Sequence, residues 1–199
     1  MPSFSIITPT IGRASLCATC DSVQAQIGPY DEHIVVYDGQ PAEWVAEYVN
    51  PLPRTKLLSI PHVGGYGAVP RDAGIAEATG DYLLFLDDDD VFNPGALDVI
   101  RQAVADNPGT MLLFRMQFFG YGGSLPDGLV LWRDKAIRDG NVSTGMIACP
   151  RLDDMPKWAT AGVHTYNCDL WFIAAMAQRV RIAWQTDIVQ TTRPHFRTL

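Results

Sequence analysis

The sequence predicts an α/β protein, with a mostly parallel central sheet flanked by helices and a second half of mixed character. Short apolar segments alternate with segments of helical periodicity over residues 1–110, which is typical of βαβ units. One apolar segment, Tyr82–Leu86, is continuous and follows Gly80, as expected for a strand buried on both faces of a parallel sheet. Residues 111–199 follow no such alternation.

The first elements are marked by apolar clusters and the residues that interrupt them. A strand is expected at Phe4–Thr8, where Pro9 ends the apolar run. Ser15 then offers a helix N-cap, and apolar residues recur at helical spacing as far as Ile27. The second strand is expected at His33–Tyr37.

The next elements continue the alternation. A short helix is expected from Pro41, because proline is favoured at the first helical position, and a third strand at Lys56–Ile60. A glycine-rich loop, Gly64–Gly67, leads to a helix around Pro70–Ala78, with Gly80 as its C-terminal stop. After the strand Tyr82–Leu86, Asn93 is expected to cap a further helix.

The pattern changes in the second half. Met111–Phe119 and Leu129–Trp132 are expected to be strands joined by a glycine-rich loop, and Gly145–Cys149 a further strand. Asp169–Arg179 is expected to be a helix, and the tail Thr191–Leu199 is polar. No linker divides the two halves, so we expect one domain over residues 1–199.

The composition suits an ordinary globular domain. The 199 residues are 47% hydrophobic and 19% charged. The net charge of -7 disfavours a protein that binds nucleic acid through its phosphates, because such binding needs a basic face. The longest apolar run of the C-terminal third, Leu170–Ala177, is too short to span a bilayer, so we expect no stable membrane insertion.

The N-terminus and the cysteines suggest a cellular compartment. The N-terminus lacks the basic region and the long apolar region of a signal peptide. Cys17 and Cys20 form a C-x-x-C within a helical pattern, so we expect buried free thiols rather than a zinc or redox site. A cytoplasmic location fits both observations.

The acidic run after Tyr82–Leu86 is the strongest functional signal. Asp87, Asp88, Asp89 and Asp90 follow the strand directly and repel one another. A bound divalent cation would relieve that repulsion, because hard cations prefer carboxylate oxygens; a solvated acidic turn is the alternative.

Other polar residues are expected at the same edge of the sheet, because parallel strands end together. Thr8-Pro9-Thr10 stands at the end of the first strand. Asp38 follows the second, where it would accept hydrogen bonds from a base or ribose or simply form an Asp-Gly turn. The glycine loop permits close backbone approach to a ligand. Arg71 begins a helix, where the dipole disfavours a cation, so a phosphate or a carboxylate partner is expected.

Four segments in order resemble the motif series of family 2 glycosyltransferases of the GT-A fold. They are Phe4–Thr10 with Arg13, Val35–Gly39, Arg71–Ile75 and Gly80–Asp90. The resemblance implies a nucleotide-sugar donor, by family habit a uridine diphosphate (UDP) sugar, and a divalent metal, Mn²⁺ or Mg²⁺. It also implies inverting transfer of a hexosyl group, with residues 1–110 binding the nucleotide and residues 111–199 the acceptor. The acceptor stays open between a glycan, a small molecule, a protein and a modified nucleic-acid base.

The resemblance also assigns residues. Those expected to bind the nucleotide sugar are Thr8, Pro9, Thr10, Arg13, Asp38, Gly65, Tyr66, Arg71, Asp87 and Asp88. The expected metal ligands are Asp89 and Asp87, with His195 as a further candidate that would otherwise be a surface residue.

Asp169 is the expected catalytic base. Its alternative role is that of an ordinary acid in the first turn of a helix, and the rival bases are Asp153 and Asp154. The sequence departs from the family pattern at three positions. Tyr37 and Cys168 stand where acids are usual, and Asp72 stands where Asn is usual.

Two other functions compete with this interpretation. Leu83–Val91 also fits the haloacid-dehalogenase-type phosphatases, with Asp87 as nucleophile, Asp89 as acid/base, and Lys135 and Asp153–Asp154 in supporting roles. That motif normally stands near the start of its domain. A metal-dependent carbohydrate-binding module without catalysis is the third function.

Three aromatic residues would stack on a sugar or pack in the core: Trp132, Trp158 and Tyr166.

Overall fold

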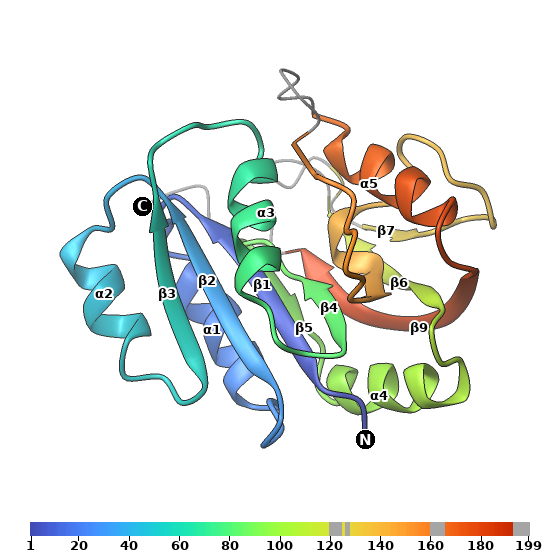
Figure 1. Cartoon of the computed structure of the whole chain (residues 1–199), viewed down its shortest axis with the longest axis horizontal. Helices are drawn as coiled ribbons and strands as arrows, with labels where there is room; N and C mark the ends of the chain where they lie inside the picture. The colour runs from blue at the N-terminus through green and yellow to red at the C-terminus, as the bar shows by residue number, and fades with distance from the viewer. Residues whose placement is uncertain (120–124, 126–127, 160–165, 193–199) are drawn as a thin grey trace.

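The computed structural model describes residues 1–119, 125, 128–159 and 166–192, and within them a nine-stranded sheet carries helices on both faces (Figure 1). The strand order is β3-β2-β1-β4-β8-β6-β9-β5, with β7 paired to β6. The first four strands are β1 (Phe4–Thr10), β2 (Glu32–Asp38), β3 (Thr55–Ile60) and β4 (Tyr82–Phe85). They pair in parallel, so their carboxyl ends share one edge of the sheet, as predicted.

The second half completes the sheet with strands of both directions. β8 (Ile147–Pro150) runs antiparallel to β4 and to β6 (Met111–Phe118), and β9 (Ile182–Thr192) runs parallel to β6. β7 (Leu129–Leu131) is antiparallel to β6, and β5 (Asp90–Phe92) is antiparallel to β9. Only β5, β7 and β8 oppose the other described strands, which confirms a mostly parallel sheet with a mixed second half.

β9 is the longest element that the sequence did not predict. Polar residues fill much of it, and its end, from Thr191, falls in the segment for which the sequence predicts a polar tail. The strand forms because its backbone pairs with β6 on one side and with β5 on the other, burying Val189 and Gln190. Residues 193–199 of the predicted tail lie outside the described residues.

Helices cover both faces of the sheet because the strands alternate their side chains. The described α-helices are α1 (Leu16–Gln24), α2 (Glu43–Val49), α3 (Ala68–Glu77), α4 (Ala96–Asp106) and α5 (Cys168–Ala177). Leu83 and Phe85 of β4 face the core under α3 and α5, whereas Leu84 faces the core under α1 and α4. Each buried side chain of this size contributes roughly 1.5–3 kcal/mol. Among the described helices, none is both long and apolar enough to cross a membrane.

The structure corrects the predicted caps of two helices and the predicted start of a third. Ser15 precedes α1, but it has helical φ/ψ angles and its hydroxyl caps no backbone N–H. Asn93 does not cap α4, which begins after Gly95; the Asn93 side chain instead donates to the Ile188 carbonyl oxygen of β9. α3 begins at Ala68, two residues before Pro70. Gly67 immediately precedes the helix and has a left-handed backbone conformation, which glycine adopts easily.

Gly80 has a packing role rather than the predicted helix-stop role. Its N–H donates to the Ser5 hydroxyl at 2.9 Å. A Cβ at Gly80 would lie 2.6 Å from the Ser5 backbone nitrogen, so no side chain fits. The glycine therefore allows the start of β4 to lie directly against β1.

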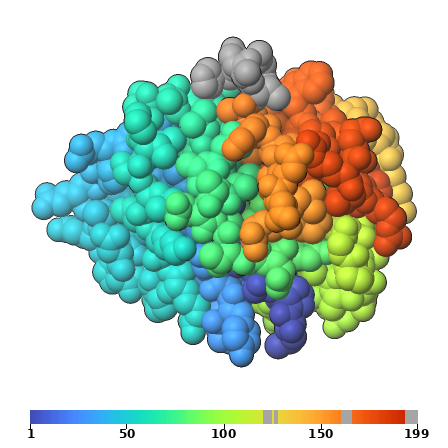
Figure 2. Space-filling view, in the orientation of Figure 1, coloured from blue at the N-terminus to red at the C-terminus, as the bar shows by residue number. Residues whose placement is uncertain are grey.

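The second half of the chain packs against the first half near α3. Figure 2 shows residues beyond 140, in orange, lying against the α3 region, in green. Two hydrogen bonds join them, because the Asp72 carboxylate of α3 accepts from the N–H groups of Trp158 and Ala159.

Candidate active site

A cleft of about 570 Å³ opens at the carboxyl edge of the parallel strands. It lies between the loops that follow β1, β2, β3 and β4 and the start of α5. The predicted site residues that line it are Pro9, Thr10, Arg13, Asp38, Gly65, Tyr66, Arg71, Asp87, Asp88, Asp89 and Asp169. The fold thus gathers residues from both halves of the chain.

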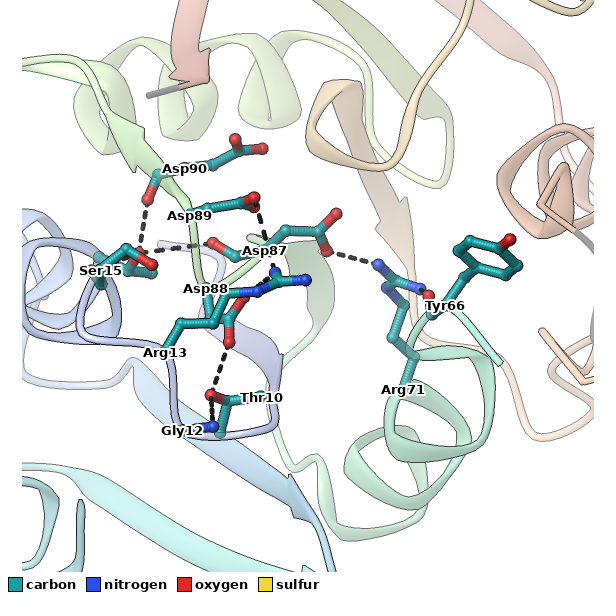
Figure 3. A network of polar contacts seen from close by, with 11 residues as sticks. Thr10, Gly12, Arg13, Ser15, Tyr66, Arg71, Asp87, Asp88, Asp89 and Asp90 are labelled. Atoms are coloured by element: carbon teal, nitrogen blue, oxygen red, sulfur yellow. Dashed lines mark hydrogen bonds and ion pairs between the residues drawn. The ribbon is translucent and has the colours of Figure 1, made fainter. Parts of the chain in front are cut away.

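Arg71 connects three parts of the cleft, and its side chain is only 3% exposed (Figure 3). Its Nη2 donates to the Asp87 carboxylate in a close ion pair. Its Nη1 donates to the Tyr66 backbone oxygen at 2.8 Å and lies 4.0 Å from the Cys168 Sγ. Burial alone lowers the pKa of the Arg71 guanidinium, but the Asp87 carboxylate and other nearby acids raise it by more, so Arg71 stays charged.

Asp88 holds the loop that follows β1 (Figure 3). Its carboxylate accepts from the Thr10 hydroxyl at 2.7 Å and from Arg13 Nη1 at 2.6 Å. The Thr10 hydroxyl oxygen in turn accepts from the Gly12 N–H at 2.9 Å. Burial raises the pKa of Asp88, although Arg13 opposes the rise. Both Asp88 oxygens are engaged within the protein, which favours a supporting role over contact with a ligand.

Asp89 has the most exposed side chain of the acidic run, at 47%, and it lies 3.6 Å from Arg13. Partial burial, then the charges of Asp87 and Asp88, raise the pKa of Asp89 to about 6. Asp87 and Asp89 therefore face the cleft as neighbouring carboxylates. Among the described residues no set of three or more His, Cys, Asp or Glu side chains forms a complete metal site. His195, the further candidate ligand, lies outside the described residues.

Asp90 turns away from the cleft into the core. Its carboxylate accepts from the Gln190 side-chain amide of β9, and its backbone oxygen accepts from the Thr19 hydroxyl at 2.7 Å. Burial raises the pKa of Asp90 well above its usual value, as does the charge of Asp87. Successive acids of the run therefore alternate in their environment. Asp88 and Asp90 are buried, whereas Asp87 and Asp89 face the cleft.

Asp38 lines the cleft, but its carboxylate is used to hold a loop. It accepts from the Val63 N–H at 2.7 Å and from the Gly64 N–H at 2.8 Å, and His62 lies 3.4 Å away. This arrangement replaces the plain Asp-Gly turn considered above. The structure places Thr8 inside the sheet, where its hydroxyl bonds the His33 ring at 2.9 Å, so the predicted contact of Thr8 with the nucleotide is corrected.

Asp169 lies in the first turn of α5 and faces the cleft. Burial raises its pKa to about 6, and the charges of Asp87 and Asp139 add to the rise, while the Leu170 N–H and Arg71 oppose it. The preceding Cys168 is a buried thiol whose pKa burial raises. The acid that the family usually has at that position is therefore replaced by a neutral group.

Two of the three aromatic candidates belong to the core. Trp158 is 1% exposed, and Trp132 is 4% exposed and packs edge-on against Trp184. Tyr166 is 51% exposed, lines the cleft and meets Tyr66 edge-on at 5.6 Å between ring centroids. Tyr166 is thus the candidate that a ligand can reach.

The residue set of the phosphatase alternative is not assembled. Lys135, Asp153 and Asp154 are exposed, and the Asp154 side chain, at 95% exposure, lies 3.7 Å from Arg179 on the outer surface. Asp153 and Asp154 therefore form a solvated turn, which also removes them as rival bases.

Some residues that line the cleft belong to no motif of the sequence. His62, Ser143 and Thr144 contribute to the cleft. Ser143 and Thr144 come from the 3₁₀ turn Thr144–Met146 and its cap, far from the motif segments in the chain. A hydroxyl in a loop becomes a candidate only when the fold shows which cavity it faces.

Solved structures share this fold. S. aureus TarS superposes with a TM-score of 0.77 at 17% identity, over 96% of this chain and 36% of that chain. Residues 1–349 of TarS in complex with UDP-GlcNAc superpose with a TM-score of 0.74 at 18% identity, over 96% and 58% of the two chains. These matches show the GT-A fold.

Sequence relatives and a family model complete the comparison. The chain is 32% identical over 111 residues to an uncharacterized glycosyltransferase of Haemophilus influenzae, over 55% of this chain and 37% of that protein. It is 26% identical over 195 residues to YwdF, an uncharacterized glycosyltransferase of Bacillus subtilis, over 89% of this chain and 69% of that protein. The model of glycosyl transferase family 2 matches residues 5–137, which is more than half of the chain. The chain therefore belongs to glycosyl transferase family 2.

Proposed function

We propose that this chain transfers a sugar from a UDP-sugar to an acceptor hydroxyl, with a divalent metal ion and with inversion at the transferred carbon. The observation that carries the proposal is one cleft that holds Asp87 and Asp89, just after β4, together with Asp169 at the start of α5. The TarS structures in complex with UDP and with UDP-GlcNAc support the choice of nucleotide.

Asp87 and Asp89 fit an Mg²⁺ or Mn²⁺ ion that is shared with the donor. Mg²⁺ in such sites is held by one or two carboxylates and by the phosphates of the substrate, so two carboxylates suffice. Burial, and then the charge of Asp87, raise the pKa of Asp89 at this point of the cleft, although Arg13 opposes the rise, and a cation bound by the two carboxylates would offset their mutual repulsion. A bound ion would act there as a Lewis acid toward the leaving diphosphate.

The chain's own residues would orient the donor from two sides. Asp38 holds the start of the glycine loop through the Val63 and Gly64 N–H groups, which sets the wall on the β2 side. Arg71 holds the end of the same loop through the Tyr66 oxygen and at the same time fixes Asp87. The donor would therefore meet a preformed edge, which reduces the entropy lost on binding.

Asp169 would take the proton from the acceptor hydroxyl. With a pKa of about 6, Asp169 is ionised at neutral pH and still basic enough to accept a proton. Attack by that hydroxyl oxygen forms the new bond to the sugar carbon as the bond to the diphosphate oxygen breaks. A single displacement of this kind inverts the configuration at the carbon.

The test is to incubate the protein with Mn²⁺, a panel of nucleotide sugars and a panel of acceptors. Nucleoside diphosphate release is followed with time, and the anomer of the product is determined by NMR. We expect Mn²⁺-dependent release from a UDP-sugar and an inverted product. The chain spans 37% and 69% of its two relatives, so the acceptor panel must include glycans, small molecules, proteins and modified bases.

Two other results would contradict the proposal. A donor that raises the melting temperature without turnover, with every acceptor, indicates a binding module. Hydrolysis of a generic phosphate ester without any donor binding indicates a phosphatase.

A further inference from the structure

Trp158 packs where three elements of the cleft meet. Its ring stacks on Phe172 of α5, with centroids 4.2 Å apart and an interplanar angle of 12°. It meets Phe85, the last residue of β4, edge-on at 4.8 Å. The guanidinium carbon of Arg71, from α3, lies 4.8 Å from the Trp158 ring centroid.

Each of these contacts leads to a functional side chain. α5 carries Asp169 in its first turn, Asp87 follows β4 after one intervening residue, and α3 supplies the Arg71 guanidinium that binds Asp87. We propose that Trp158 is a positioning residue that sets Asp169 and Asp87 at their working separation, acting through Arg71 and Phe172. The inference deepens the proposed function, because it concerns the geometry of that same cleft.

Trp158 is itself held in place by α3. The Asp72 carboxylate accepts from the Trp158 N–H at 2.9 Å and from the Ala159 N–H at 3.1 Å, one bond to each oxygen. The same helix thus binds the backbone of Trp158 through Asp72 and its ring through Arg71. This explains why an acid replaces the Asn of the family pattern, because an amide offers an acceptor on only one of its two terminal atoms.

The contacts of Trp158 favour a positioning role over sugar stacking. At 1% exposure its ring is out of reach of a ligand, and its Nε1 has no hydrogen-bond partner within the described part of the chain. A guanidinium held over an aromatic face away from water is attracted to it more strongly than in solvent. The ring therefore helps to keep Arg71 charged and aligned beneath the cleft.

The chain contains a matched control for this arrangement. Trp132 is also buried, and Arg115 lies 4.4 Å from its ring centroid. Trp132 packs with Met116 and Met146 in a separate cluster, outside the residues that line the cleft. Trp132→Leu therefore removes a buried tryptophan beneath an arginine without touching Asp87 or Asp169.

The first experiment measures position without measuring activity. Cys168 is 5% exposed, and its Sγ lies 4.0 Å from Arg71 Nη1. The rate at which iodoacetamide labels this thiol, measured by mass spectrometry, therefore reports whether Arg71 and the start of α5 keep their positions. In Trp158→Leu we expect Cys168 to react about tenfold faster, with a smaller change in Trp158→Phe and none in Trp132→Leu. Cys20 and Cys149, both 0% exposed, should stay protected in every variant.

Two labelling results would overturn the inference. In one, Cys168 reacts no faster in Trp158→Leu than in Trp132→Leu. In the other, Cys20, Cys149 and Cys168 all become reactive together in Trp158→Leu, which would show general loosening of the core rather than a local role.

The second experiment measures turnover at a temperature where all variants are folded. We expect kcat with Mn²⁺ and a UDP-sugar to fall about 100-fold in Trp158→Leu, with a smaller change in the donor KM, and to recover largely in Trp158→Phe. Adding Trp158→Leu to Arg71→Lys should lower kcat by less than the product of the two single effects, because the two substitutions share the Arg71–Trp158 contact. Unchanged kcat in Trp158→Leu, or full additivity, would overturn the inference. If the wild type turns over no donor, the proposed function fails and the labelling result decides the role of Trp158.

Discussion

The guanidinium of Arg71 and the carboxylate of Asp87 form an ion pair that joins α3 to the acid following β4 (Figure 3). The two partners differ in exposure, at 3% for the Arg71 side chain and 33% for that of Asp87. The buried Arg71 therefore fixes the orientation of the Asp87 side chain from the protein interior, and part of the carboxylate stays open to the cleft. Arg71 acts as the partner of an acid, which is one of the two roles that its sequence position suggested.

The Arg71–Asp87 pair should contribute to stability. Arg71→Met leaves Asp87 next to a buried apolar side chain, so we expect the free energy of unfolding to fall by about 3 kcal/mol. Urea denaturation followed by circular dichroism measures the loss. The matched control is Arg138→Met, which breaks the exposed pair with Asp134 and should leave the free energy of unfolding almost unchanged, because water and salt screen such a pair. Equal losses in the two variants would contradict this account.

Asp89 should control metal activation. In Asp89→Asn we expect the Mn²⁺ concentration for half-maximal thermal stabilisation by UDP to rise at least about tenfold, because a carboxylate ligand is lost. EDTA should abolish the metal-dependent part of the stabilisation in the wild type. Asp153→Asn, which changes an exposed acid outside the cleft, serves as the control and should behave as the wild type. Similar Mn²⁺ responses in Asp89→Asn and Asp153→Asn would remove Asp89 as a ligand.

Asp169 should determine the pH dependence of transfer. The base works only when ionised, so with a pKa of about 6 we expect kcat/KM to rise from about pH 5 and to level off above about pH 7. Asp169→Asn should lower kcat by at least about 100-fold and leave UDP affinity unchanged. Undiminished transfer by this variant would show that Asp169 is only a helix N-terminal acid.

The ionisation of Asp169, which should increase activity as pH rises, should decrease the stability of the fold. The pKa of Asp169 is higher in the folded state than in the unfolded state, so the folded state binds the proton more tightly. The contribution of Asp169 to the free energy of unfolding should therefore fall as pH rises from about 4 through about 6, and it is measured as the difference between the wild type and Asp169→Asn. Arg71 limits this fall, while Asp87 and Asp139 increase it. Without ligands, we expect Asp169→Asn to be more stable than the wild type by about 2 kcal/mol at neutral pH, measured by urea denaturation.

Asp38 should act on the nucleotide through the glycine loop. Asp38→Ala leaves the Val63 and Gly64 N–H groups without their acceptor, so we expect faster proteolysis within residues 61–67 and UDP affinity lower by about tenfold. Asp38→Asn keeps one acceptor oxygen and should be intermediate in both measurements. Weaker UDP binding with an unchanged rate of proteolysis would instead indicate direct contact between Asp38 and the nucleotide.

The sequence predicted the features that depend on the local pattern of residues. An uninterrupted apolar run can be buried only between two layers, so Tyr82–Leu86 predicted a central strand and Asp87–Asp90 predicted an acidic edge. The order of motifs was enough to predict the family and the GT-A fold, both of which are confirmed. The metal, the inversion and the cytoplasmic location stay predictions.

Tertiary structure alone decided what each polar residue of that edge does. All seven residues of β1 are buried, so alternation along the strand cannot separate Thr8, which bonds His33 inside the sheet, from Thr10, which holds Asp88. β9 is held as a strand by its neighbours β6 and β5, because polar residues interrupt its apolar ones and its sequence has no regular alternation.

Contacts between residues far apart in the chain set the remaining roles. Trp158 lies beneath Arg71 and Asp72 binds its backbone, although 86 positions separate Asp72 from Trp158. A one-dimensional pattern reports which residues are apolar, charged or able to turn the chain. It cannot report which distant side chain will neutralise a charge or accept a hydrogen bond, because that depends on how helices and sheet pack. The sequence therefore determined the family and the edge of the sheet where the site lies, and the packing decided which of its acids face the cleft.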